Sequence, residues 1–143
     1  MIEVSRRCEI AASPAEVWAA LADFAAISSW AANVDHSCLM SEQTEGVGMF
    51  RRIQAGRMTL LERVVSWEPD VCLSYELEGL RAIVRSATNT WTIEATATGS
   101  MVTLTSRADA GPRPPQQLIA KAVGRKLAQA SDQMLSGLKA KLT

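Results

Sequence analysis

The stretch that decides the fold reads GPRPPQQLIAKAVGRKLAQASDQMLSGLKAKL over residues 111–142. Its proline-rich start ends the preceding sheet, because proline cannot donate a hydrogen bond to a strand ladder. Apolar residues then recur at helical spacing, namely Ile119, Val123, Leu127, Ala130, Met134 and Leu138. This pattern predicts a helix of about 25 residues with one apolar face, long enough to cross a whole sheet.

The residues before this helix predict a sheet of seven strands. The segment Ile2–Ile10 alternates apolar and polar residues, which is typical of a half-buried strand. Turn residues then divide the chain at regular intervals up to Ala108. The six further strands are predicted at Val34–Met40, Val47–Gln54, Arg57–Trp67, Val71–Leu77, Ala87–Ala97 and Met101–Ala108.

Two short helices are expected between the first and second strands. Ser13, Pro14 and Glu16 supply an N-cap serine, a proline at the first helical position and a glutamate at the third, which is a capping box. The segment Phe24–Trp30 predicts a second short helix. Together these elements predict an α+β fold in one domain over residues 1–143, with a curved antiparallel sheet around the C-terminal helix.

The composition is that of a globular protein, with 48% hydrophobic and 21% charged residues. Fifteen basic residues balance fifteen acidic ones, so a nucleic-acid partner is not expected. No apolar run approaches the roughly 18 residues of a membrane span, and the N-terminus lacks a signal-peptide pattern. Cys8, Cys38 and Cys72 are far apart, which favours reduced core thiols in a cytoplasmic protein.

One face of the predicted sheet places polar residues among apolar ones. They are Arg51, Glu62, Tyr75 and Asn89. A two-residue turn at 55–56 would place Arg51 opposite Leu60, so that Arg51 and Glu62 become diagonal neighbours. A sealed core rarely accepts four such groups, whereas a ligand cavity uses a few polar groups in an apolar wall. The alternatives are a structural ion pair for Arg51 and Glu62, and a core aromatic for Tyr75.

The predicted ligand-binding residues share this sheet face or the apolar face of the long helix. They are Met49, Arg51, Ile53, Met58, Leu60, Glu62, Leu73, Tyr75, Leu77, Asn89, Trp91, Ile119, Val123 and Leu127. The single histidine, His36, is expected in the core or at its rim, and no clustered ligands favour a metal site. Gly46 and Gly48 lack the lysine of a phosphate loop, so no cofactor is expected.

With these motifs the sequence resembles the SRPBCC superfamily of START-like, helix-grip proteins, often described as polyketide cyclase/dehydrase. The resemblance covers essentially the whole chain, through Ile10–Trp18, Trp30, Gly46–Arg51, Glu62–Val64, Tyr75, and Trp91 with the final helix. It implies a sheet that grips the C-terminal helix around a deep hydrophobic cavity. The segment Val47–Ile53 with Glu62 is also similar to abscisic-acid receptors, whose matching glutamate faces the cavity. Their gate and latch sequences are absent here, so that role does not carry over.

Three functions are compatible with this sequence. The first is binding or carriage of a small hydrophobic molecule that is lipid-like, aromatic or polyketide-like. The second is an aromatase/cyclase-type enzyme, in which Glu62 moves a proton, Arg51 stabilises an enolate and Tyr75 donates to a ketone. The third is an interaction module with a vestigial cavity. The chain could act as a monomer or a homodimer.

Overall fold

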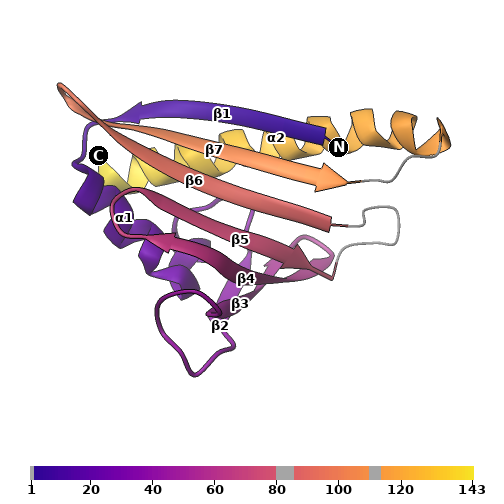
Figure 1. Ribbon diagram of the computed structural model, residues 1–143, viewed down its shortest axis with the longest axis horizontal. Coiled ribbons are helices and arrows are strands. Elements are labelled where there is room, and N and C mark those ends of the chain that lie inside the picture. Colours follow the sequence, from indigo (N-terminus) through magenta and orange to yellow (C-terminus); the bar gives the residue numbers. More distant parts are fainter. Residues whose placement is uncertain (1, 80–85, 110–113) are drawn as a thin grey trace.

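A computed structural model describes residues 2–79, 86–109 and 114–143, with the side chains of the last range described from Lys121 onward. Seven antiparallel strands form one curved, unclosed sheet in the order β1-β7-β6-β5-β4-β3-β2 (Figure 1). The strands are β1 (Ile2–Ile10), β2 (His36–Leu39), β3 (Phe50–Ala55), β4 (Met58–Glu68), β5 (Cys72–Glu78), β6 (Ser86–Thr96) and β7 (Gly99–Asp109). The helical elements are α1 (Pro14–Ala22), the 3₁₀ helix η1 (Phe24–Ser29) and α2 (Pro114–Leu142). The predicted fold class is therefore confirmed.

The capping box forms as predicted at the start of α1. The Ser13 hydroxyl accepts a hydrogen bond from the backbone N–H of Glu16 at 3.2 Å, and the Ser13 N–H donates to the Glu16 carboxylate at 3.4 Å. These contacts satisfy two N–H groups that a helix start otherwise leaves unpaired. The η1 helix follows and buries Phe24 and Ile27.

The hairpin between β3 and β4 corrects the predicted register. Ala55 pairs with Met58, so the two-residue turn is formed by residues 56 and 57 rather than 55 and 56. Gly56 has a φ of +60°, which suits the first central position of a II′ turn and favours glycine. As a result Arg51 lies directly opposite Glu62, not diagonal to it. Each residue of β3 pairs two residues further along β4 than predicted. Because side chains alternate with a period of two, the same residues still face inward.

The prediction for β2, which gave Val34–Met40 with His36 and Cys38 on the inward side, is wrong in both its bounds and its inward side. The strand begins at His36, and its partly buried residues are Ser37 and Leu39. His36 and Cys38 are exposed on the other side, so His36 is not a core residue and Cys38 is not a core thiol. Ser37 faces inward because its hydroxyl donates to the Ala25 carbonyl at 2.6 Å and accepts from the Ser28 N–H at 3.1 Å.

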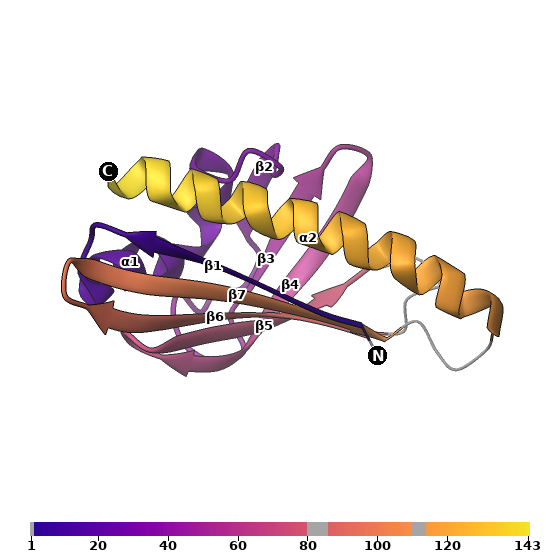
Figure 2. The same cartoon turned by 90° about the horizontal axis from the view of Figure 1, so that it is seen from above.

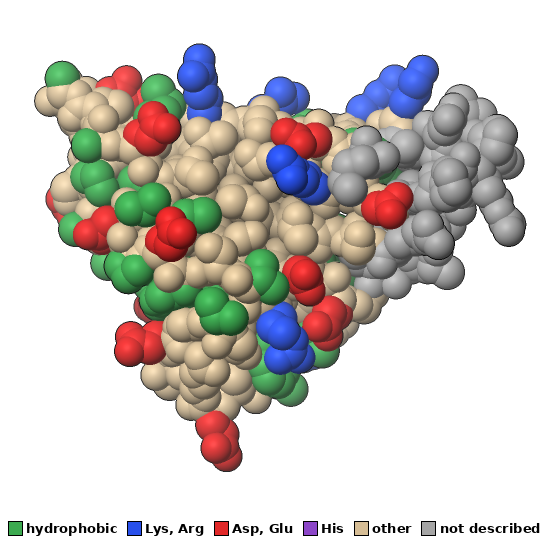
Figure 3. Space-filling model, viewed as in Figure 1, with side chains coloured by type: hydrophobic (Ala, Val, Ile, Leu, Met, Phe, Trp, Pro, Cys, Tyr) green, Lys and Arg blue, Asp and Glu red, His purple; other side chains and the backbone are tan. Residues whose placement is uncertain are grey.

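The inward face of the remaining strands is largely as predicted. The charged residues Arg51 and Glu62 are buried, and so are the aromatic residues Tyr75 and Trp91. Two apolar residues differ: Met58 is 41% exposed at the hairpin tip, and Val71 is 52% exposed because it precedes β5. Figure 3, which views the face away from α2, shows acidic and basic side chains scattered among neutral ones. Along these strands, buried residues on the inner face alternate with more exposed residues on the outer face. This is typical of an antiparallel sheet with one face against the core.

The long helix α2 runs along the inner face of the sheet, and its first turns extend beyond the ends of the strands (Figure 2). Its C-terminal half is tightly packed, with Met134, Leu135 and Leu138 buried. Upstream, Val123 and Leu127 are only half-buried, which leaves space between this part of the helix and the sheet. Among the described residues, no helix is long and apolar enough to cross a membrane.

Candidate ligand-binding cavity

A partly enclosed cavity of about 370 Å³ lies between the upstream half of α2 and the sheet. Eight of the predicted ligand-binding residues line it. They are Ile53, Met58, Leu60, Glu62, Leu77, Asn89, Val123 and Leu127. The structure therefore brings predicted residues of β3, β4, β5, β6 and α2 around one space.

Five other predicted residues lie in the core and do not line the cavity. They are Met49, Arg51, Leu73, Tyr75 and Trp91, each at most 2% exposed. The Trp91 ring packs edge-to-face on Trp30, with 6.0 Å between the ring centroids. Ile119 lies in the part of α2 whose side chains are outside the described residues.

The prediction missed eight residues of the cavity wall, namely Ile27, Asn33, Val34, Ala55, Ser106, Lys126, Ala130 and Met134. Signals for several of them were present in the sequence. Ala130 and Met134 belong to the apolar face predicted for the long helix. Ser106 continues the inward alternation of Val102 and Leu104 along β7. Lys126 stands three residues after Val123, and therefore on the same side of the helix. Asn33 lies in a loop between η1 and β2, where no periodicity marks the inward side.

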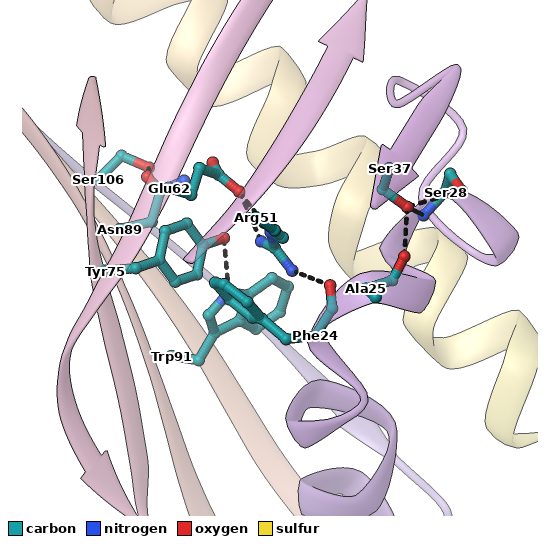
Figure 4. A network of polar contacts seen from close by, with 10 residues as sticks. All are labelled: Phe24, Ala25, Ser28, Ser37, Arg51, Glu62, Tyr75, Asn89, Trp91 and Ser106. Atoms are coloured by element: carbon teal, nitrogen blue, oxygen red, sulfur yellow. Dashed lines mark hydrogen bonds and ion pairs between the residues drawn. The ribbon is translucent and has the colours of Figure 1, made fainter. Parts of the chain in front are cut away.

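Arg51 is sealed inside the protein by contacts on several sides (Figure 4). Its Nε donates to Oε1 of Glu62 at 2.7 Å, and Nη2 lies 2.6 Å from the same oxygen. Its Nη1 donates to the Phe24 carbonyl at 2.8 Å, and the guanidinium carbon lies 3.6 Å from the Phe24 ring centroid. Because Phe24 covers it, Arg51 is a partner of Glu62 rather than part of the cavity wall.

Asn89 and Ser106 form the polar floor of the cavity with Glu62. The Ser106 hydroxyl donates to Oδ1 of Asn89 at 2.7 Å and lies 3.5 Å from the Ser131 hydroxyl of α2. Glu62, Asn89 and Ser106 are at most 6% exposed. At the edge of the wall, Oδ1 of Asn33 is buried without a hydrogen-bond partner among the described residues. These groups can hydrogen-bond a polar atom of a guest.

Tyr75 is buried behind the cavity, and its hydroxyl accepts a hydrogen bond from Nε1 of Trp91 at 3.2 Å. Burial raises the pKa of this hydroxyl, and the negative charge of Glu62 raises it further. Arg51 and the hydrogen bonds of Trp91 and Asn89 oppose the shift. The arrangement keeps Tyr75 neutral and gives it the environment of a core aromatic.

We expect the Tyr75 hydroxyl to resist ionisation until the protein unfolds. The folded state favours the neutral phenol, while the unfolded chain ionises near pH 10. This contribution to stability is therefore complete below about pH 10 and is lost as the pH rises above it. Since Tyr75 is the only tyrosine, near-ultraviolet absorbance reports its ionisation directly. Tyrosinate that forms near pH 10 while circular dichroism remains native would contradict the prediction.

The described residues bring no cluster of metal ligands together at this site. Within residues 2–79, 86–109 and 114–143, no group of three or more His, Cys, Asp or Glu side chains is placed to hold a metal ion. His36, on the outer side of the edge strand β2, is not among the residues that line the cavity.

Comparison with known proteins gives a family and a fold. A family model described as polyketide cyclase/dehydrase and lipid transport matches residues 1–143. No curated protein matches the chain. Similar solved structures include XoxI from Bacillus cereus, with 16% identity and a TM-score of 0.82 over 99% of this chain and 96% of that chain.

Two further structures are similar over nearly their whole length. The Zhui aromatase/cyclase from Streptomyces sp. R1128 is 15% identical, with a TM-score of 0.83 over 99% of this chain and 93% of that chain. A START superfamily protein from Mycobacterium smegmatis is 15% identical, with a TM-score of 0.76 over 99% of both chains. At such identities the likeness establishes the fold alone.

Proposed function

We propose, because this chain belongs to the polyketide cyclase/dehydrase and lipid transport family, that its cavity binds and carries a small, mostly apolar molecule. Membership of this family confirms the SRPBCC resemblance of the sequence. Members of one fold serve different functions, so the proposal depends on the cavity of this chain rather than on its relatives.

The observation that carries the proposal is the partly enclosed space between α2 and the sheet. Its volume of about 370 Å³ is near the lower end of the range of about 300–1,000 Å³ for small-molecule sites. Most of its wall is apolar, and Glu62, Asn89 and Ser106 supply directed polar groups. A cavity of this size suits a compound of up to three rings, or a medium-length alkyl chain, better than a long lipid.

Binding is better supported than chemistry because of where the catalytic candidates lie. Of Glu62, Arg51 and Tyr75, only Glu62 lines the cavity. The Arg51 guanidinium is held by Glu62 and Phe24, and the Tyr75 hydroxyl is held by Trp91. A group that polarises a carbonyl must come within hydrogen-bond distance of it, which Arg51 and Tyr75 do not offer here.

Filling the cavity tests the proposal. The wild-type chain should bind N-phenyl-1-naphthylamine, a neutral apolar fluorophore whose emission rises when it leaves water. Ala130→Phe places an aromatic ring at the cavity wall, and we expect it to weaken this binding about tenfold or more, equivalent to about 1.4 kcal/mol. Fluorescence titration gives the two dissociation constants.

Ala140→Phe is the matched control, since Ala140 is exposed on the same helix and outside the cavity. It should leave binding of the fluorophore unchanged. Thermal unfolding of both variants shows whether α2 still packs, and the bound fluorophore should raise the melting temperature of the wild type. Absence of binding to the wild type, or equal binding by Ala130→Phe, would refute the proposal.

A further inference from the structure

We infer that the ligand is an anionic amphiphile, whose negative group pairs with Lys126 at the mouth of the cavity while its apolar part lies inside. The inference rests on the proposed function and adds the chemical class of the molecule. A carboxylate on a ring system or on an alkyl chain is the simplest such ligand.

The charges at the cavity wall carry the inference. Among the described residues, two charged side chains line the cavity, Glu62 and Lys126. Glu62 is already balanced by Arg51, whose Nη2 lies 2.6 Å from Oε1. Lys126 makes no ion pair within the described part of the chain. The wall therefore has one uncompensated positive charge, which attracts an anion.

The position of Lys126 explains how one molecule can contact both the exposed mouth and the buried interior of the cavity. The residue is exposed and yet lines the cavity, so it marks the mouth, whereas Glu62 and Asn89 are buried at the floor. Its methylene groups can lie along the apolar wall while the ammonium group reaches the rim. Val123 and Ala130, three residues before and four after it, line the same cavity.

Among the described residues, no acidic side chain other than Glu62 lines the cavity. Asp35 lies next in sequence to the wall residue Val34 but does not itself line the cavity. Its carboxylate accepts a hydrogen bond from the Gly56 N–H at 2.8 Å. Within the described residues, the ammonium group is thus available to a guest that arrives with its own negative charge.

Two probes of equal chain length separate the charge from the apolar contact. Octanoate and 1-octanol are titrated into the wild type, Lys126→Gln and Lys141→Gln, and calorimetry gives each dissociation constant. We expect Lys126→Gln to shift the ratio of the octanoate and octanol affinities about fivefold towards the alcohol, as for a partly exposed ion pair. Any change in octanol affinity measures the lost apolar contact of the lysine methylene groups, and the ratio removes it from the comparison. Lys141→Gln is the control, since Lys141 is exposed on α2 outside the cavity.

The outcomes distinguish this inference from the proposed function. A ratio that shifts in Lys126→Gln but not in Lys141→Gln supports the inference. If the ratio is the same in all three proteins, or if octanol binds and octanoate does not, the anionic class is wrong while the cavity remains a binding site. If neither probe binds the wild type and the neutral fluorophore also fails to bind, the proposed function falls and the inference falls with it.

Discussion

Glu62→Gln is expected to lower the free energy of unfolding by about 3–5 kcal/mol, because it leaves the Arg51 guanidinium buried without a counter-charge. Both side chains of the ion pair are only 3% exposed. Glutamine keeps the shape of Glu62 and can still accept one hydrogen bond, so the loss measures the missing charge. Urea denaturation gives the free energy of unfolding, and an unchanged m-value shows that the same surface is exposed.

An exposed ion pair between β4 and the next strand, β5, provides the control. Nε of Arg63 lies 3.3 Å from Oε1 of Glu78, and these side chains are 40% and 45% exposed. Glu78→Gln should therefore cost less than about 1 kcal/mol. The double variant Arg51→Met/Glu62→Leu should recover most of the stability lost in Glu62→Gln, because an apolar pair removes both buried charges. Equal losses in Glu62→Gln and Glu78→Gln would show that burial does not strengthen the inner pair.

Gly137→Ala is expected to destabilise the protein by about 3 kcal/mol, at the upper end for an overpacked core. Gly137 lies where α2 meets the chain at Trp30, and an added Cβ would overlap the Trp30 carbonyl oxygen. It would also stand 3.0 Å from the Trp30 carbonyl carbon. These are backbone atoms that cannot rotate away, so the helix itself must move. Chemical denaturation monitored by circular dichroism measures the loss.

Gly124→Ala is the control within the same helix. Among the described residues, an added Cβ there would contact the Ile2 side chain alone, at 3.4 Å. Alanine also favours a helix over glycine by about 1 kcal/mol, so this variant should be neutral or slightly stabilised. Similar destabilisation by both substitutions would show that the close approach of α2 to Trp30 does not limit the size of residue 137.

Hydrophobic periodicity was sufficient to predict most of the fold. The two-residue repeat of a strand and the 3.6-residue turn of a helix are local properties. The sequence alone therefore predicts β1, β4 and α2. The prediction failed in β2, where four residues at an edge give too little periodicity to choose a side. It also misplaced the β3–β4 turn by one residue, although the inward face of both strands was unaffected.

The candidate site could be predicted only in part. Alternation correctly placed Arg51, Glu62, Tyr75 and Asn89 on the inward side of the sheet. Alternation could not show which of these side chains would be covered by residues from the helices that pack on the sheet. Phe24, distant in sequence, packs over Arg51 and turns it into an internal partner of Glu62.

The sequence by itself determined the order of elements, the inward face of the sheet and the apolar face of the long helix, because each depends on spacing between near neighbours. Only the tertiary structure decided which inward residues border open space. That depends on how closely α2 approaches the sheet along its length. Gly137 lets the C-terminal half of the helix pack tightly, while Val123 and Leu127 upstream stay half-buried above a cavity. The same geometry leaves Glu62 at the floor and Lys126 at the mouth.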